Sequence, residues 1–212
     1  MKYGSNICRD LLHISKQRES PFFDRVCSKL EGNLKEFSHS TDLLAGLVDS
    51  LDLYCETISI ESALVNLLPP LLQATNSKFG FLAEVCYTEL NRPYLLTHAV
   101  VDIYKTDYTI FDILSNLQFH NLDTLNGSVM TSQAPVLSND PANDSRSSGV
   151  PFGHGKIENY LGLPFLVDGK LVGAAALANR PGGYQPTIID ALKPLCQIIG
   201  LLIADWRTSS KS

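Results

Sequence analysis

Apolar side chains recur at steps of three and four residues through the first structured part of the chain. One such stripe comprises Leu44, Leu47, Leu51, Tyr54 and Ile58. This spacing predicts an amphipathic helix over 41–58, because positions three or four apart share one side of a helix. Ser59 is a favourable N-cap, and helical spacing continues behind it, which predicts a second helix over 59–72. Pro69 and Pro70 interrupt that run, so either the helix kinks there or its end is misplaced.

Extended segments follow the two helices. Residues 79–86 and 94–101 are rich in β-branched and aromatic residues and flank Asn91-Arg92-Pro93, which predicts a β-hairpin. The pattern over 102–122 is ambiguous. Residues 124–132 suit a short helix, and 135–138 suit a short strand.

A second hairpin is predicted from two apolar runs, 159–167 and 171–179, joined by Asp168-Gly169-Lys170. Asp-Gly supplies the positive φ angles of a tight primed turn. Pro164 lacks an amide hydrogen and therefore belongs at an edge or a bulge. The small residues from Gly173 to Ala176 predict a strand that helices, or a ligand, approach closely.

The chain closes with an apolar stripe at alternating steps of four and three, which predicts an amphipathic helix over 186–206 beginning at Pro186. Its members are Ile188, Leu192, Leu195, Ile199, Leu202 and Trp206. A second line through Ile189, Cys196 and Ile203 widens the apolar side, so this helix could cover the sheet and still meet a second subunit. Residues 1–40 are interpreted as a helical extension with a break at Ser20-Pro21, 41–208 as one domain with a core at 59–206, and 209–212 as a tail.

Composition narrows the classes of partner. The chain has 212 residues, 44% of them hydrophobic, and its formal net charge is −5 with scattered Lys and Arg residues. One core is expected, and neither nucleic acid nor a membrane is an expected partner. No apolar leader follows Met1, and no later apolar run is uninterrupted for long enough to cross a bilayer. Together with five dispersed cysteines, this predicts a reduced, cytoplasmic protein.

Three motifs in the second half resemble the GAF domain family. They are Pro135-Val136 leading to Asn139-Asp140, then Gly162-Leu163-Pro164 followed by a turn and Val172-Gly173, and then the run from Asn179 to Tyr184. The resemblance covers about 59–206. It implies an α/β (α+β) fold with a central antiparallel sheet of about five to six strands, flanked by helices, in which the N- and C-terminal helices pack together on one face.

The resemblance places the polar loop 139–156 over a ligand pocket on one face of the sheet. By position, the pocket rim would comprise Phe81, Asn139, Asp140, His154, Tyr160 and Asn179. His154 could donate to a ligand, or it could hold the loop to a nearby carbonyl. The Asn and Asp residues of the loop concentrate oxygens, but they lack the alternating spacing of a calcium loop, so turn and capping roles are favoured and no metal is expected.

Catalytic residues are not expected. Some GAF proteins reduce free methionine sulfoxide with pocket-loop cysteines, and phytochrome-like members attach a bilin to a loop cysteine, but loop 139–156 contains no cysteine. No covalent chromophore is therefore expected, and no motif for nucleotide, acyl-transfer or metalloprotease chemistry occurs.

Three hypotheses follow. The first is a sensory or regulatory domain that binds an unidentified small molecule and acts on a signalling output protein in trans. The second is a homodimeric adaptor with a vestigial pocket and an interface built from 41–58 and 186–206. The third is a redox enzyme of the methionine sulfoxide reductase kind.

Overall fold

The central layer is an antiparallel sheet with the strand order β3-β2-β1-β7-β6-β5, and β4 also pairs with β2. A computed structural model describes residues 39–101, 113–114, 116–149 and 155–209. The strands are β1 (Phe79–Tyr87), β2 (Pro93–Val101), β3 (Ile113–Leu114), β4 (Gln118–Phe119), β5 (Val136–Ser138), β6 (Tyr160–Val167) and β7 (Lys170–Ala178). The antiparallel α+β architecture is confirmed.

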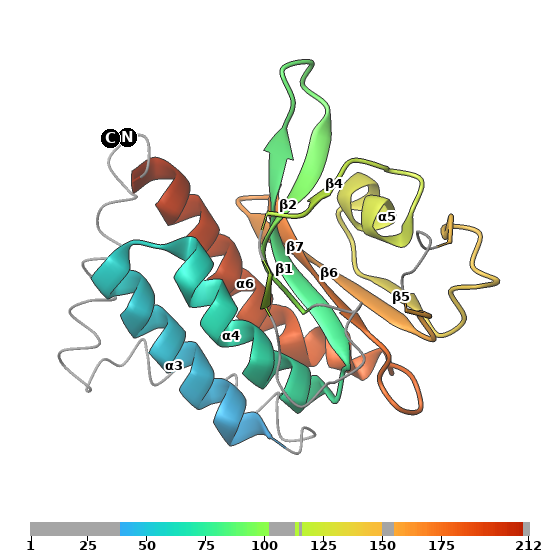
Figure 1. The fold of residues 1–212 in the computed structure, drawn as a ribbon, viewed down its shortest axis with the longest axis horizontal. Coiled ribbons are helices and arrows are strands. Elements are labelled where there is room, and N and C mark those ends of the chain that lie inside the picture. Colours follow the sequence, from blue (N-terminus) through green and yellow to red (C-terminus); the bar gives the residue numbers. More distant parts are fainter. Residues whose placement is uncertain (1–38, 102–112, 115, 150–154, 210–212) are drawn as a thin grey trace.

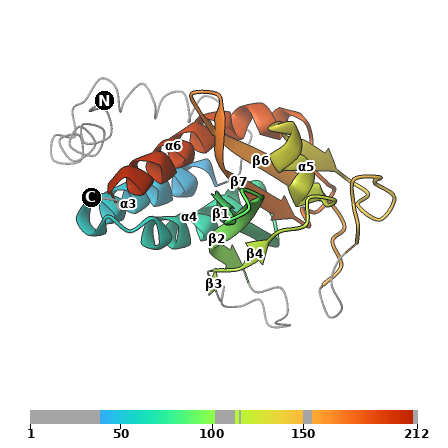
Figure 2. The same cartoon turned by 90° about the horizontal axis from the view of Figure 1, so that it is seen from above.

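Helices cover both faces of this sheet unequally. The helices α3 (Ser40–Thr57), α4 (Ile60–Thr75) and α6 (Thr187–Ser209) form a layer on one face, and α5 (Leu125–Ser132) lies on the other (Figures 1 and 2). The larger buried core lies between the sheet and the three-helix layer, and a smaller one lies beneath α5. The hydroxyl of Tyr54 on α3 donates to Asp205 on α6 at 2.9 Å. The expectation that N- and C-terminal helices share one face is therefore confirmed.

The helix predicted over 59–72 extends further than expected. Ser59 caps it as predicted, with its hydroxyl accepting from the Ser62 amide at 3.1 Å, but α4 runs on to Thr75 with Pro69 and Pro70 inside it. The predicted helix end is therefore corrected. Gly46 on α3 allows close contact at this point, because a Cβ on Gly46 would lie 2.5 Å from Pro70 Cγ.

Both predicted hairpins are present. The pairing of β1 with β2 shifts between Leu82 and Ala83, which leaves His98 as an extra, bulged residue on β2. The turn from β6 to β7 has positive φ angles at Asp168 (50°) and Gly169 (73°), as a primed turn requires. Pro164 lies on the part of β6 beyond its last pair with β5.

Successive small residues of β7 pack on opposite faces of the sheet. Ala175 belongs to the core under the three helices, whereas Ala174 and Ala176 belong to the core under α5. A Cβ on Gly173 would overlap the carbonyl oxygen of Ala83 and lie 2.9 Å from Ile203 on α6. This confirms the prediction that helices approach this strand closely.

By length and composition, α6 is long and apolar enough to cross a membrane, with a mean hydropathy of 1.7 over its most apolar window. Lys193, Pro194, Gly200 and Asp205 interrupt this stretch, so it is not an uninterrupted apolar run. Half of that window is buried inside the fold, because α6 packs against β6 and β7.

Candidate functional site

The face of the sheet beneath α5 contains two of the predicted rim residues. Phe81 on β1 is 8% exposed and stacks on Phe119 of β4, with ring centroids 5.0 Å apart. Tyr160 on β6 is 6% exposed in the same apolar cluster. The helix α5 contributes the side chains that cover them, namely Leu125, Val129 and Met130. The two aromatic residues therefore lie in a packed layer and not on an open rim.

Tyr160 links the sheet to α5. Its ring lies against Gly162, where a Cβ would lie 2.5 Å from the Tyr160 hydroxyl, and that hydroxyl donates to Asn126 Oδ1 on α5 at 2.7 Å. Burial raises the pKa of Tyr160 far above its ordinary value, so the phenol stays a neutral donor. A ligand beneath α5 would meet this hydroxyl and the aromatic pair first.

Asn139 holds the start of loop 139–156 to the segment before α6. Its Nδ2 donates to the Tyr184 carbonyl at 3.0 Å, and its Oδ1 accepts from the Tyr184 amide at 2.8 Å. The Tyr184 hydroxyl is in turn 2.7 Å from Ser77 Oγ. Both polar atoms of the Asn139 amide group are thus used by the protein's own backbone.

Asn179 holds the far end of that loop in the same way. Its Oδ1 accepts from the Glu158 amide at 2.7 Å, and its Nδ2 donates to the Lys156 carbonyl at 2.8 Å. Neighbouring Asn159 makes a matching pair of bonds with the backbone of Arg180, at 2.9 Å each. The loop ends are therefore fixed by asparagine side chains at both sides.

Asp140 stands apart from the other candidates. It is exposed, and its carboxylate accepts from Asn143 Nδ2 at 2.7 Å. Further along, Arg146 donates through Nε and Nη2 to Asp144 at 2.9 and 2.7 Å, and these bonds hold the pKa of Asp144 far below its ordinary value. These contacts are turn-stabilising, as favoured from the sequence.

The predicted rim is thus divided among several places. Phe81 and Tyr160 share one buried cluster, Asn139 and Asn179 hold the two ends of the loop, and Asp140 lies on the outside of a turn. His154 lies outside the described residues. Its assignment as a rim residue stays a prediction.

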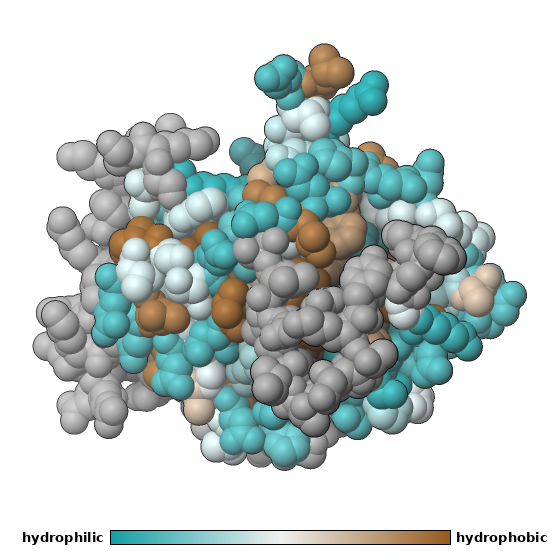
Figure 3. Space-filling view, in the orientation of Figure 1, coloured by the Kyte–Doolittle hydropathy of each residue, from teal (hydrophilic) through white to brown (hydrophobic). Residues whose placement is uncertain are grey.

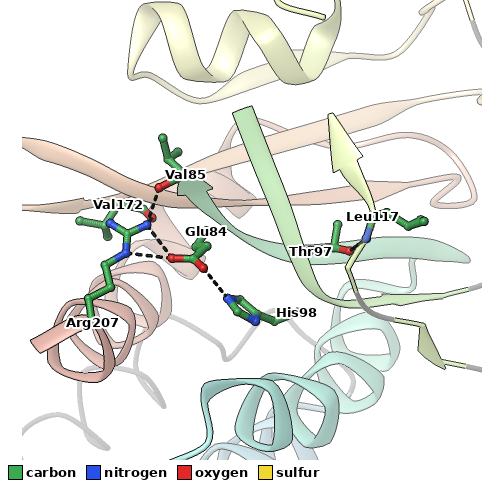
Figure 4. A network of polar contacts seen from close by, with 7 residues as sticks. All are labelled: Glu84, Val85, Thr97, His98, Leu117, Val172 and Arg207. Carbon is green, nitrogen blue, oxygen red and sulfur yellow. Dashed lines mark hydrogen bonds and ion pairs between the residues drawn. The ribbon is translucent and has the colours of Figure 1, made fainter. Parts of the chain in front are cut away.

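A buried ionic network on the opposite face was missed from the sequence (Figure 4). Glu84 on β1, 4% exposed, accepts from Arg207 Nε on α6 at 2.9 Å, and its other oxygen lies 3.3 Å from His98 Nε2. Arg207 Nη2 also donates to the carbonyls of Val85 and Val172. The last turn of α6 is therefore fixed to two strands by one guanidinium.

Burial alone would raise the pKa of Glu84. The hydrogen bonds and charges of His98 and Arg207 have a larger, opposite effect, so the net pKa of Glu84 lies below the usual 4.5. Trp206 packs edge-on against the His98 ring, with centroids 5.3 Å apart. A lone Glu in an otherwise apolar strand and an Arg on the last turn of an apolar helix were the available signals. Only the fold shows that they meet.

Two of the three cysteines in the described residues have raised pKa values. Burial and the nearby Glu84 carboxylate raise the pKa of Cys86 to about 11, and burial raises the pKa of Cys196 to about 12. Little thiolate forms at these two positions near neutral pH, so both are weak nucleophiles. Groups of three or more metal-ligating side chains are absent from the described part of the chain.

Comparison with known proteins relates the chain to one family. A family model described as GAF domain matches residues 61–204. No curated protein matches the chain in sequence.

Several solved structures share the fold. The GAF domain from a phosphoenolpyruvate-protein phosphotransferase (ptsP) of Coxiella burnetii has a TM-score of 0.63 at 16% identity, covering 81% of this chain and 98% of that one. The corresponding Acinetobacter domain has a TM-score of 0.59 at 15% identity, covering 80% and 98%. Free methionine-R-sulfoxide reductase from Neisseria meningitidis, in complex with its substrate, has a TM-score of 0.54 at 11% identity, covering 74% and 86%. At such identities the likeness shows the fold alone.

Replacing Arg207 should show how much the guanidinium offsets the free-energy cost of burying Glu84. At pH 7 we expect Arg207→Met to lower the free energy of unfolding by about 3–5 kcal/mol, because the buried Glu84 carboxylate loses its guanidinium partner and keeps only its contact with His98. The pKa of Glu84 should rise, so the loss should shrink as pH falls below the usual 4.5 and Glu84 becomes neutral. Denaturant unfolding at pH 7 and pH 4 measures both effects.

Two controls accompany this variant. The exposed Arg92→Met should change stability little, and Glu84→Gln combined with Arg207→Met should recover part of the loss. An equal loss at both pH values would show that the ionised form of Glu84 is not what Arg207 stabilises.

Proposed function

Because the chain belongs to the GAF domain family, we propose that it is a regulatory domain that acts by binding and carries out no chemical reaction. One observation carries this proposal. The polar side chains of the predicted pocket that lie within the described residues bond to the protein itself, with Asn139 and Asn179 on backbone groups and Tyr160 on Asn126. They position segments of the chain, and none is held next to a candidate nucleophile.

The state of the thiols supports the same proposal against the redox alternative. A thiol-based reductase needs a thiolate on the substrate side of the sheet. Cys86 is next to Glu84 and Tyr94, its pKa is raised to about 11, and Cys196 is buried in α6. Cys86 and Cys196 therefore do not support the reductase activity of the Neisseria neighbour in this chain.

The ligand site that the geometry favours is the cluster beneath α5. The Phe81–Phe119 stack offers an aromatic surface, and Tyr160 with Asn126 offers a hydrogen-bonding pair beside it. These groups suit a small planar molecule with one polar edge. Because these side chains contact one another beneath α5, binding requires α5 to move.

A route from this site to the outer helices exists in the described contacts. β1 carries Phe81 on the α5 side and Glu84 on the helix side, and Glu84 holds Arg207 on α6. A shift of β1 on ligand binding would therefore alter the support of the last turn of α6. A signalling protein that binds in trans would detect the change on α6.

A second candidate, a homodimeric adaptor with a filled pocket, is favoured by a different observation. Leu201 on α6 is 39% exposed, and Pro194 and Ile198 lie on the same side of the helix and are half-buried. Ile58, at the end of α3, is 41% exposed. Apolar side chains exposed on terminal helices fit a contact with a second copy of the chain.

Native mass spectrometry of gently purified protein tests the ligand site. We expect a retained small molecule in the wild type, and about tenfold weaker retention in Tyr160→Phe, because the hydrogen bond from the Tyr160 hydroxyl to the ligand is lost. Tyr54→Phe is the matched control, since it removes a buried hydroxyl on the opposite side of the sheet. Equal retention in both variants would exclude the cluster beneath α5.

Alkylation tests the absence of thiol chemistry. Near neutral pH, Cys86 and Cys196 should not react with iodoacetamide in the folded protein, because their raised pKa values leave almost no thiolate. Both should react fully in denaturant. Rapid labelling of Cys86 in the folded state would reopen the enzyme hypothesis.

The adaptor candidate predicts a dimer that depends on α6. Leu201→Asp should shift the dimer to monomer by light scattering, because a carboxylate in an apolar interface is desolvated without a partner. Leu90→Asp, at the tip of the β1–β2 hairpin where Leu90 is 77% exposed, is the control and should leave the dimer intact. A wild-type monomer at all concentrations would exclude this candidate.

A further inference from the structure

An open groove runs between α3 and α4 on the outer side of the helix layer. Its volume is about 710 Å³. Apolar and small side chains form its floor, namely Ala45, Gly46, Leu53, Val65, Pro69 and Pro70. Apolar surface is visible over these two helices in Figure 3. A groove of this kind along a helix pair has the shape that accepts a third helix.

The groove is acidic. Asp42 and Asp49 line it, and α3 and α4 together contain Asp and Glu residues but neither Lys nor Arg. A helix that fills the groove should therefore present apolar residues to the floor and basic residues at its edge.

The chain contains one segment with both properties immediately before α3. Apolar residues in 21–37 recur at helical spacing and cover one side of a helix, while its charged residues fall on the other side. The apolar set is Phe22, Phe23, Val26, Cys27, Leu30, Leu34 and Phe37. Arg25, Lys29 and Glu36 lie along one edge of this stripe, which gives that edge two basic residues and one acidic residue. Ser20 and Pro21 form a favourable helix start, as N-cap and first helical residue.

Connection and length also match. Only residues 38 and 39 separate this segment from α3, which begins at Ser40. A connection of two residues joins antiparallel neighbouring helices. Seventeen helical residues span about 25 Å, close to the length of α3 with its 18 residues.

We propose that residues 21–37 form an amphipathic helix that occupies the α3–α4 groove of the same chain, antiparallel to α3. Its apolar stripe covers the groove floor, and Lys29 lies near Asp49. This arrangement removes α3 from the surface that a second subunit could use, so that of the two terminal helices only α6 remains available for such a contact.

Alkylation of a thiol placed in the groove tests the proposal in the full chain. Ala45→Cys introduces a thiol at an exposed position that lines the groove. Ser132→Cys, at an exposed helical position on α5, is the reference. Peptide mass spectrometry separates the introduced thiols from the native ones. We expect the thiol at position 45 to react at least about tenfold more slowly than the reference, because the segment must leave the groove first.

A second substitution identifies the occupant. Leu30→Asp, added to Ala45→Cys, should raise the rate to within about twofold of the reference by displacing the segment, whereas Glu31→Lys on its polar side should not. Protection that survives Leu30→Asp would mean another occupant and would overturn the proposal. Protection that grows with protein concentration would assign the groove to a second copy, and equal rates at both positions would show an empty groove; either result also overturns it.

Discussion

The burial of the central strand β7 on both faces constrains the rest of the fold. It lies between β1 and β6, with α6 against one face and α5 against the other. Two helices can approach one strand this closely only where its side chains are small, and Gly173 to Ala176 meet that condition. The two cores of the domain are therefore separate, and each face can serve a different purpose.

Separation of the faces explains where the polar groups lie. Glu84 points into the helix side, where burial would raise its pKa, and the protein offsets this with Arg207 and His98. Another buried hydrogen bond, from the Tyr54 hydroxyl to Asp205, joins α3 to α6. On the α5 side the buried polar contact is the neutral pair Tyr160–Asn126. Arg207 thus holds α6 to the sheet through Glu84, and the neutral Tyr160–Asn126 pair joins α5 to the sheet.

Loop 139–156 is held by asparagine side chains at its two ends. Asn139, Asn159 and Asn179 each donate and accept with backbone groups of a different segment. An asparagine side chain carries the same donor and acceptor as a peptide unit, so it can replace a strand partner where regular pairing stops. In this structure the polar atoms of these side chains therefore bond to backbone groups, and the assignment of Asn139 and Asn179 as ligand contacts stays a prediction.

The sequence by itself determined the elements, because helical and extended periods and turn residues are local properties. The Ser59 cap, the Asp168–Gly169 turn and the small residues of β7 were all readable in this way. The motifs from Pro135 to Tyr184 also indicated the family. The end of α4 was misjudged, since tertiary packing against Gly46 carries the helix past Pro69 and Pro70.

Only the tertiary structure decided which polar residues meet. Glu84, His98 and Arg207 are far apart in the chain, and the bulge that directs His98 toward Glu84 depends on how β1 pairs with β2. The burial of Phe81 and Tyr160 could not be predicted either. A sequence pattern shows which side of a strand a residue faces, but it does not show whether α5 covers that side. Contacts between distant segments depend on packing in three dimensions, and periodicity along one dimension does not encode it.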